Sequence, residues 1–137
     1  MNRFSKFLNY FHIFKTEVSD YFRYIFSFSH FKIYLAILAF LNILIWGGTF
    51  YIDKKIIDQQ IALHYNVDFG IDYYGDISNI YIIPILGLFF TIFNTAFLAI
   101  VKKHKDFIFI SHLLLSISIV TNLILITAII SIFLVNY

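Results

Sequence analysis

The run "FIFISHLLLSISIVTNLILITAIISIFLV" at residues 107–135 decides the fold of this chain. His112 is the only ionisable side chain among these 29 residues. About 20 consecutive apolar residues already suffice for a helix that crosses the roughly 30 Å hydrocarbon core of a bilayer. The run therefore predicts a membrane span that tilts or extends into the headgroup region.

Two further runs of the chain are apolar and carry no charged side chain, at residues 33–52 and 79–101. Of the 137 residues, 61% are hydrophobic and 13% are charged, against about 25% charged in soluble domains. The alternative, that the runs are core helices of a soluble protein, leaves too little polar surface to cover them. We predict an all-α membrane protein with a three-helix membrane domain at residues 33–137.

The positions of the basic residues predict the orientation in the membrane, since cytoplasmic loops carry an excess of Lys and Arg. Eight of the ten basic residues lie in residues 1–32 and 102–106. The outer loop, residues 53–78, has Lys54 and Lys55 but five aspartates. We expect a multi-pass protein of the cell (inner) membrane, with a cytoplasmic N-terminus, an extracytoplasmic loop and an extracytoplasmic C-terminus. No cleavable signal peptide is apparent before the first run.

The N-terminal segment, residues 1–32, predicts an amphipathic helix. Its apolar side chains recur at steps of three and four, for example at Phe7, Phe11, Phe14 and Val18. Such a helix, with basic residues on its other side, suits the cytoplasmic surface of a membrane. The alternative is a helix packed on the cytoplasmic ends of the spans.

Each predicted span carries an asparagine in its interior: Asn42, Asn94 and Asn122. An amide that faces lipid leaves its donors and acceptors unpaired, so such residues normally face other helices. We interpret them as helix-packing groups that form interhelical hydrogen bonds. A path for a polar solute is the alternative, although ion and proton pathways usually need intramembrane charged groups.

The outer loop contains a strictly alternating stretch at residues 61–71, with apolar side chains at every second position. Alternation of this kind indicates an extended strand with one buried face, here Leu63, Tyr65, Val67 and Phe69. A strand alone in water is unstable, so we expect it to cap the outer ends of the helices or the lipid interface. Gly70 and Gly75 would permit it to fold back as a hairpin.

The loop is the candidate partner-binding site, with candidate residues His64, Tyr65, Asn66, Phe69, Gly70 and Asp72. Its histidine and carboxylates could hold a divalent cation, but the spacing of a calcium loop is missing, and a solvated face is the favoured interpretation. The chain has no cysteine, which excludes thiolate sites. We therefore predict no catalytic residue, metal or cofactor.

The stretch "LHYNVDFGIDYYGD" followed by "IPILGLFFTIFNTAFLAI" resembles a group of small, uncharacterised bacterial multi-pass membrane proteins. These share an LHYN-x-x-FGID-x-x-G loop and then a P-x-x-G helix with an internal asparagine. The resemblance covers about residues 40–135, and the chain departs from the pattern at Asp68, Tyr73 and Tyr74. It implies a membrane protein and supplies no activity. The matching positions are Leu63, His64, Tyr65, Asn66, Phe69, Gly70, Ile71, Asp72, Gly75, Pro84, Gly87 and Asn94.

Two functions are compatible with this pattern. The first is a non-enzymatic accessory or interaction subunit that lies in the lipid bilayer and binds a membrane protein partner, or a second copy of itself, through the outer loop. The second is a subunit of a small oligomeric transporter or channel. An enzyme is less compatible, because the sequence shows no catalytic triad, metal or phosphate-binding constellation. No pattern suggests binding to nucleic acid.

Overall fold

The computed structural model describes residues 3–56, 60–66 and 68–137, and at residues 4, 65 and 66 it describes the backbone alone. The chain divides into two compact units, Met1–Leu35 and Ala36–Tyr137. The division falls within one helix, three residues beyond the predicted boundary at residue 32. Each unit is described by itself below.

The first unit contains α1, Arg3–Phe26, and the beginning of α2, Ser29–Lys55. The turn between the two helices is held by the hydroxyl of Ser27, which donates a hydrogen bond to the carbonyl of Tyr24 at 2.6 Å. Phe7, Phe11 and Phe14 are exposed, whereas Tyr21 and Ile25 are buried. Exposed phenylalanines one turn apart are what a helix on a membrane surface requires, and the amphipathic role of α1 stays a prediction.

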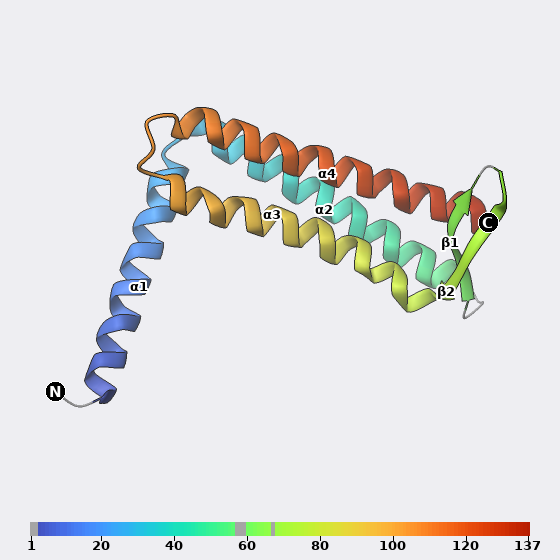
Figure 1. Ribbon diagram of the computed structural model, residues 1–137, viewed down its shortest axis with the longest axis horizontal. Helices are drawn as coiled ribbons and strands as arrows, with labels where there is room; N and C mark the ends of the chain where they lie inside the picture. Colours follow the sequence, from blue (N-terminus) through green and yellow to red (C-terminus); the bar gives the residue numbers. More distant parts are fainter. Residues whose placement is uncertain (1–2, 57–59, 67) are drawn as a thin grey trace. The chain divides into compact units, whose positions relative to one another are not determined.

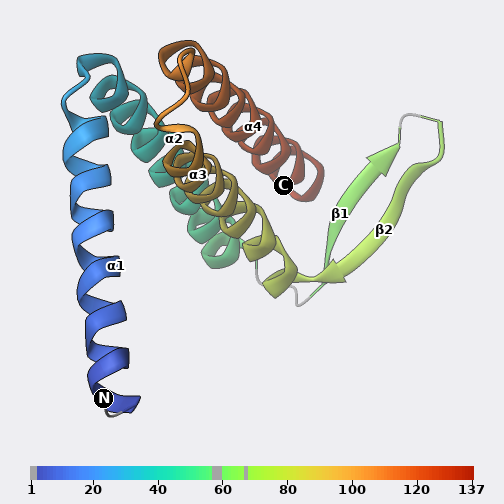
Figure 2. The ribbon, with the colours of Figure 1, turned by 60° about the vertical axis from the view of Figure 1, so that its left-hand side comes forward.

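The second unit is a bundle of three helices, formed by α2 from residue 36 onward, α3 (Ile82–Val101) and α4 (Phe107–Asn136). Figures 1 and 2 show that they run side by side, with α3 antiparallel to the other two. All three are long and apolar enough to cross a membrane. The protein is therefore an integral, all-α membrane protein, which confirms the predicted fold class.

The bundle is joined along a narrow seam of buried residues on each helix. On α2 the buried residues recur at steps of three and four, and those on α3 and α4 follow similar steps. Helices that pack side by side at a shallow angle bury such a stripe. Outside the seam the apolar side chains are exposed, among them Ile100, Phe109 and Leu134. In a membrane protein this outer surface faces lipid. The seam residues include Leu38, Leu41, Ile45, Thr49 and Ile52 on α2, Pro84, Gly87, Asn94 and Leu98 on α3, and Ser111, Leu115, Ser118 and Asn122 on α4.

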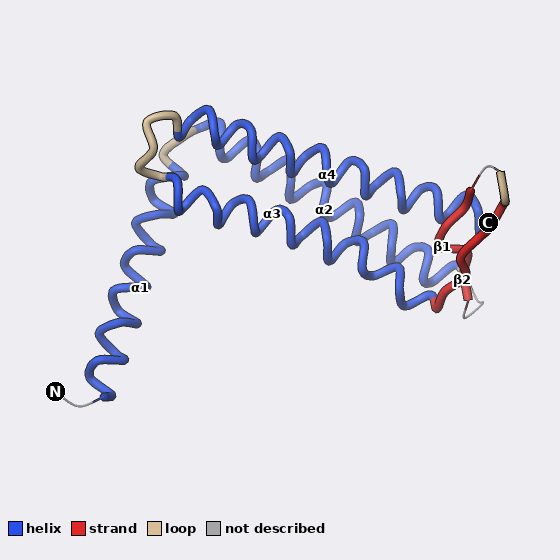
Figure 3. Tube along the Cα trace, in the orientation of Figure 1, coloured by secondary structure: helices blue, strands red, loops and turns tan. Residues whose placement is uncertain are grey.

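The loop between α2 and α3 folds as an antiparallel hairpin of β1 (Gln60–Asn66) and β2 (Gly70–Asp76), followed by a 3-10 helix, η1 (Ile77–Tyr81). In Figure 3 the strands lie at one end of the bundle, and the short α3–α4 loop lies at the other. The hairpin rests on a cluster of buried isoleucines, in which Ile61 of β1 and Ile80 of η1 join Ile45, Ile52, Ile129 and Ile132 of α2 and α4.

The prediction of one strand over residues 61–71 is wrong, because the chain turns back at residues 68–69. The fold-back as a hairpin, which Gly70 and Gly75 were expected to permit, is what the structure shows. Gly70 adopts a φ of 75°, a conformation that costs other residues energy. Phe69, expected on the buried face, is 84% exposed at the tip of the hairpin. The buried residues are Ile61 and Ala62 at the base, because only the base lies over the helix ends. Of the other residues expected on that face, Leu63 is half-buried, while Val67 and the side chain of Tyr65 lie outside the described part of the chain.

Pro84 lies in the first turn of α3. The N–H groups of the first turn have no acceptor within their own helix, so a proline there removes no intrahelical hydrogen bond. The proline therefore requires no kink in α3. The proline instead marks the start of the helix after η1.

Two adjacent glycines of α2 test how closely the helices of the bundle pack. A Cβ atom on Gly48 would lie 2.8 Å from Cγ2 of Ile129 on α4, whereas one on Gly47 would meet nothing within 4 Å. We expect Gly48→Leu to lower the free energy of unfolding by about 1–3 kcal/mol, the usual cost of overpacking. Denaturant titration in detergent micelles measures it.

Gly47→Leu is the matched control, since it introduces the same side chain one residue away. It should leave stability unchanged or raise it by up to about 1 kcal/mol through helix propensity. Equal effects of the two substitutions would contradict the close approach of α2 and α4.

Candidate functional site

The hairpin is irregular in register. Ala62 pairs with Tyr74 and His64 pairs with Tyr73, so Leu63 has no partner of its own. Such an irregularity bends a strand and increases its twist. A Cβ atom on Gly75 would collide with the end of the Leu63 side chain, so a larger residue at this position of β2 requires Leu63 to move.

Asn136, the last residue of α4, holds the base of the hairpin. Its Nδ2 donates a hydrogen bond to the carbonyl of Ala62 at 2.8 Å, and its Oδ1 accepts one from the N–H of Ala62 at 2.8 Å. The same Nδ2 donates to the carbonyl of Ile132 within α4. A side-chain amide offers the same donor and acceptor as a peptide unit, so Asn136 acts as a short piece of a third strand beside β1.

This contact also determines which way the peptide groups of β2 point. Because Ala62 directs its N–H and C=O toward Asn136, Ala62 and Tyr74 form a pair that is not hydrogen-bonded to each other. Both members of such a pair direct their peptide groups away from the partner strand. The N–H and C=O of Tyr74 therefore point outward, along the outer edge of β2. No described residue outside the hairpin donates a backbone hydrogen bond to this edge.

The candidate residues predicted from sequence are brought together in part. Nδ1 of His64 and Oδ1 of Asp72 lie 2.6 Å apart across the hairpin, and both side chains are exposed. Phe69 and Gly70 form the tip. The side chains of Tyr65 and Asn66 lie outside the described part of the chain. Two exposed tyrosines of β2, Tyr73 and Tyr74, join the surface although the prediction did not include them.

The junction of the hairpin and α3 is ordered by two contacts. Oδ1 of Asp76 accepts a hydrogen bond from the N–H of Ser78 at 2.8 Å and caps η1. The hydrogen bonds to Ser78 lower the pKa of the Asp76 carboxyl. The hydroxyl of Tyr81 donates to Oδ2 of Asp53 at 3.0 Å, which ties η1 to the last turns of α2.

The hairpin offers few groups for chemistry. Within residues 3–56, 60–66 and 68–137, no three His, Asp or Glu side chains gather as they would to hold a metal ion. The His64–Asp72 pair lies on an exposed surface rather than in a closed pocket. The surface presents aromatic side chains and an open strand edge, and such edges can bind an extended segment of another chain.

The three asparagines lie inside the bundle and bond across it. Nδ2 of Asn42 on α2 donates to Oδ1 of Asn122 on α4 at 3.0 Å, and Nδ2 of Asn122 lies 3.3 Å from Oγ1 of Thr91 on α3. Nδ2 of Asn94 donates to Oγ of Ser118 at 2.8 Å, which adds a second link between α3 and α4. The asparagines thus form hydrogen bonds between helices, and their role as packing groups stays a prediction.

Space for this cluster is made by Gly87. A Cβ atom there would lie 2.9 Å from Oδ1 of Asn122 and 3.4 Å from Cδ1 of Ile45. Oδ1 of Asn42 is buried without a hydrogen-bond partner among the described residues. The cluster is thus polar but uncharged, and its side chains bond both across the helices and to carbonyls of their own helices.

Comparison with known proteins finds no family, no curated protein and no solved structure that matches this chain. The resemblance to small bacterial multi-pass proteins stays a prediction. Functional inference therefore rests on the geometry of the hairpin and the bundle.

The contact between Asn136 and Ala62 can be tested by Asn136→Ala. We expect the amide of Ala62 to exchange its hydrogen about tenfold faster, because its carbonyl and N–H lose partners at a cost of about 1–3 kcal/mol. Hydrogen exchange followed by mass spectrometry of peptides from residues 60–76 measures this. Thr127→Ala is the control, since the Thr127 hydroxyl is exposed and bonds to the carbonyl of Ile124 in its own helix. Unchanged exchange in Asn136→Ala would show that the hairpin is held elsewhere.

The amide pair inside the bundle can be measured by a double-mutant cycle of Asn42→Ala and Asn122→Ala. We expect a coupling of about 0.6–2 kcal/mol, the range of interhelical hydrogen bonds in membranes. Unfolding of the single and double variants in mixed micelles gives the value. Additive effects, with no coupling, would mean that the two amides do not bond. Asn122→Ala with Thr127→Ala, an exposed position of α4, is the uncoupled control.

Proposed function

We propose that this protein is a non-enzymatic accessory subunit of the cell membrane that binds a membrane protein partner through its hairpin. The distribution of Lys and Arg supports an extracytoplasmic position for this hairpin and for the C-terminus. The observation that carries the proposal is the outward edge of β2, next to the exposed rings of Tyr73, Tyr74 and Phe69.

An exposed strand edge is a template for another strand. The two edges of this hairpin differ, because β1 is closed at Ala62 by Asn136 and β2 is open at Tyr74. A partner that adds an extended segment to β2 gains main-chain hydrogen bonds from the edge and specificity from the side chains beside it. The base of the hairpin packs on the isoleucine cluster, so the edge of β2 has a fixed position relative to the ends of α2 and α4.

The charge of the hairpin indicates the chemistry of the partner strand. Residues 60–81 contain Asp68, Asp72 and Asp76 and no Lys or Arg. Pairing of β2 with β2 of a second copy would bring like charges together, which is unfavourable in cross-strand pairs. A partner strand that carries Lys or Arg is complementary, so a different protein is favoured over a homo-oligomer.

The alternative, a subunit of an oligomeric transporter or channel, stays a prediction. The polar side chains within the bundle bond to each other and to backbone carbonyls of the helices, and none of Asn42, Thr91, Asn94, Ser118 and Asn122 is charged. This arrangement favours a packing role over a solute path.

The strand edge can be tested in cells with a photo-reactive phenylalanine analogue at position 73. We expect cross-linking to one defined membrane protein, at a segment that contains basic residues. Tyr74→Pro should lower the yield about tenfold, because it removes the outward N–H and leaves the partner's acceptor unpaired. Mass spectrometry of the adduct identifies the segment.

Tyr74→Thr is the matched control, since it removes the ring but keeps the N–H and favours a strand. It should retain most of the cross-linking. Equal loss in both variants would show that the partner contacts the ring of Tyr74 and does not pair with the strand. A homodimer as the only adduct would contradict a separate partner.

A further inference from the structure

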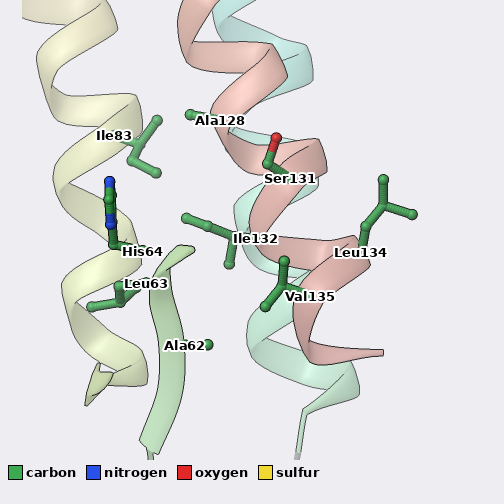
Figure 4. Close-up of a pocket in the computed structure, with 9 residues that line it drawn as sticks. All are labelled: Ala62, Leu63, His64, Ile83, Ala128, Ser131, Ile132, Leu134 and Val135. Carbon is green, nitrogen blue, oxygen red and sulfur yellow. The ribbon is translucent and has the colours of Figure 1, made fainter. Parts of the chain in front are cut away.

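A cavity of about 480 Å³ lies between β1, the start of α3 and the last turns of α4. Figure 4 shows Ile83 on the α3 side, Ala128 and Ile132 on the α4 side, and His64 on β1 near Ile83. In this view α2 lies behind α4, so the cavity is on the face of the α3–α4 pair away from α2. Its volume falls within the usual range of about 300–1,000 Å³ for small-molecule sites.

The lengths of two helices place this cavity at one level of the membrane. The 20 residues of α3 measure about 30 Å, the thickness of the hydrocarbon core, so Ile83 lies near its edge. On α4, which begins after the charged loop at residues 102–106, about 20 residues from Phe107 reach the neighbourhood of Thr127. Ala128 and Ile83 therefore both lie where the acyl chains meet the headgroups.

The lining of the cavity is mostly apolar, with Ile83 and Ala128 toward the membrane and Ala62, Leu63 and Val135 toward the end of α4. Its polar groups are the hydroxyl of Ser131 and the imidazole of His64, which lies near Ile83 and bonds to Asp72. A mostly apolar cavity with polar groups near the level where the acyl chains meet the headgroups suits a phospholipid. The imidazole and the carboxylate also offer partners for both the phosphate and the ammonium group of a zwitterionic headgroup.

We propose that this cavity binds one phospholipid of the surrounding leaflet, with an acyl chain between α3 and α4 and the headgroup at the His64–Asp72 pair. The bound chain fills the space beneath β1 that protein side chains leave open. Lipid thereby becomes part of the support of the hairpin. This site does not depend on any partner at the edge of β2.

Native mass spectrometry with palmitoyl-oleoyl phosphatidylethanolamine added to the detergent-solubilised protein tests the site. We expect one lipid to remain bound under collisional activation that removes all others. Ala128→Trp, which fills the cavity, should weaken this binding at least about tenfold, since the loss of about two buried methylene contacts already has that effect. Retention of the lipid by Ala128→Trp would overturn the proposal.

Ile130→Trp is the matched control. Ile130 lies two residues away on α4, is 50% exposed and does not line the cavity. It should keep the bound lipid. Equal loss in both tryptophan variants would show that binding is non-specific, which also overturns the proposal.

A second measurement uses the unaltered protein, so it does not depend on the folding of a variant. Phosphatidylcholine vesicles that contain a trace of phosphatidylethanolamine with a diazirine in its acyl chain are irradiated. We expect adducts concentrated at residues 62–64, at Ile83 and at residues 128–135. Adducts spread evenly over the exposed faces of α2, α3 and α4, or a cross-linked dimer through the cavity, would contradict a lipid site.

Discussion

The side chain of Asn122 holds three helices together at the middle of the bundle. Its Oδ1 accepts a hydrogen bond from Asn42 of α2, and its Nδ2 contacts Thr91 of α3 and the carbonyl of Ser118 in its own helix. An unpaired amide in apolar surroundings is costly, so these contacts select one rotation of each helix about its axis. Gly87 makes the arrangement possible because a Cβ atom there would collide with Oδ1 of Asn122.

The hairpin depends on this arrangement. A two-stranded hairpin is at best marginally stable by itself in water. Here Ile61 and Ile80 complete a cluster whose other members come from the ends of α2 and α4, so the strands are ordered only once those ends are in place. Asn136 then satisfies the peptide group of Ala62, which leaves β2 as the strand with the open edge.

The two proposed sites use different parts of this end of the bundle. The edge of β2 offers peptide groups and aromatic rings to an extended segment of another protein. The cavity beneath β1 offers mostly apolar walls, with the imidazole of His64 and the hydroxyl of Ser131 among them, near the level where the acyl chains meet the headgroups. A hairpin supported in part by lipid and exposed at its tip is suited to a subunit that acts by holding a partner at the membrane surface.

The three spans could be predicted from sequence alone, because hydrocarbon thickness sets a minimum length for an uncharged helix, and this requirement is local. The burial of Asn42, Asn94 and Asn122 followed from the cost of an amide in lipid. Gly70 and Gly75 allowed a hairpin to be considered, but the turn at residues 68–69 did not follow, since an alternating pattern is equally compatible with one strand or with the two strands of a hairpin. The contact of Asn136 with Ala62, the open edge of β2 and the cavity were decided only by the tertiary structure, because each joins groups that are far apart in the chain. A helix-terminal asparagine has the same local sequence whether its amide meets water or a strand, and only the packing of the helix ends brought Ala62 within its reach.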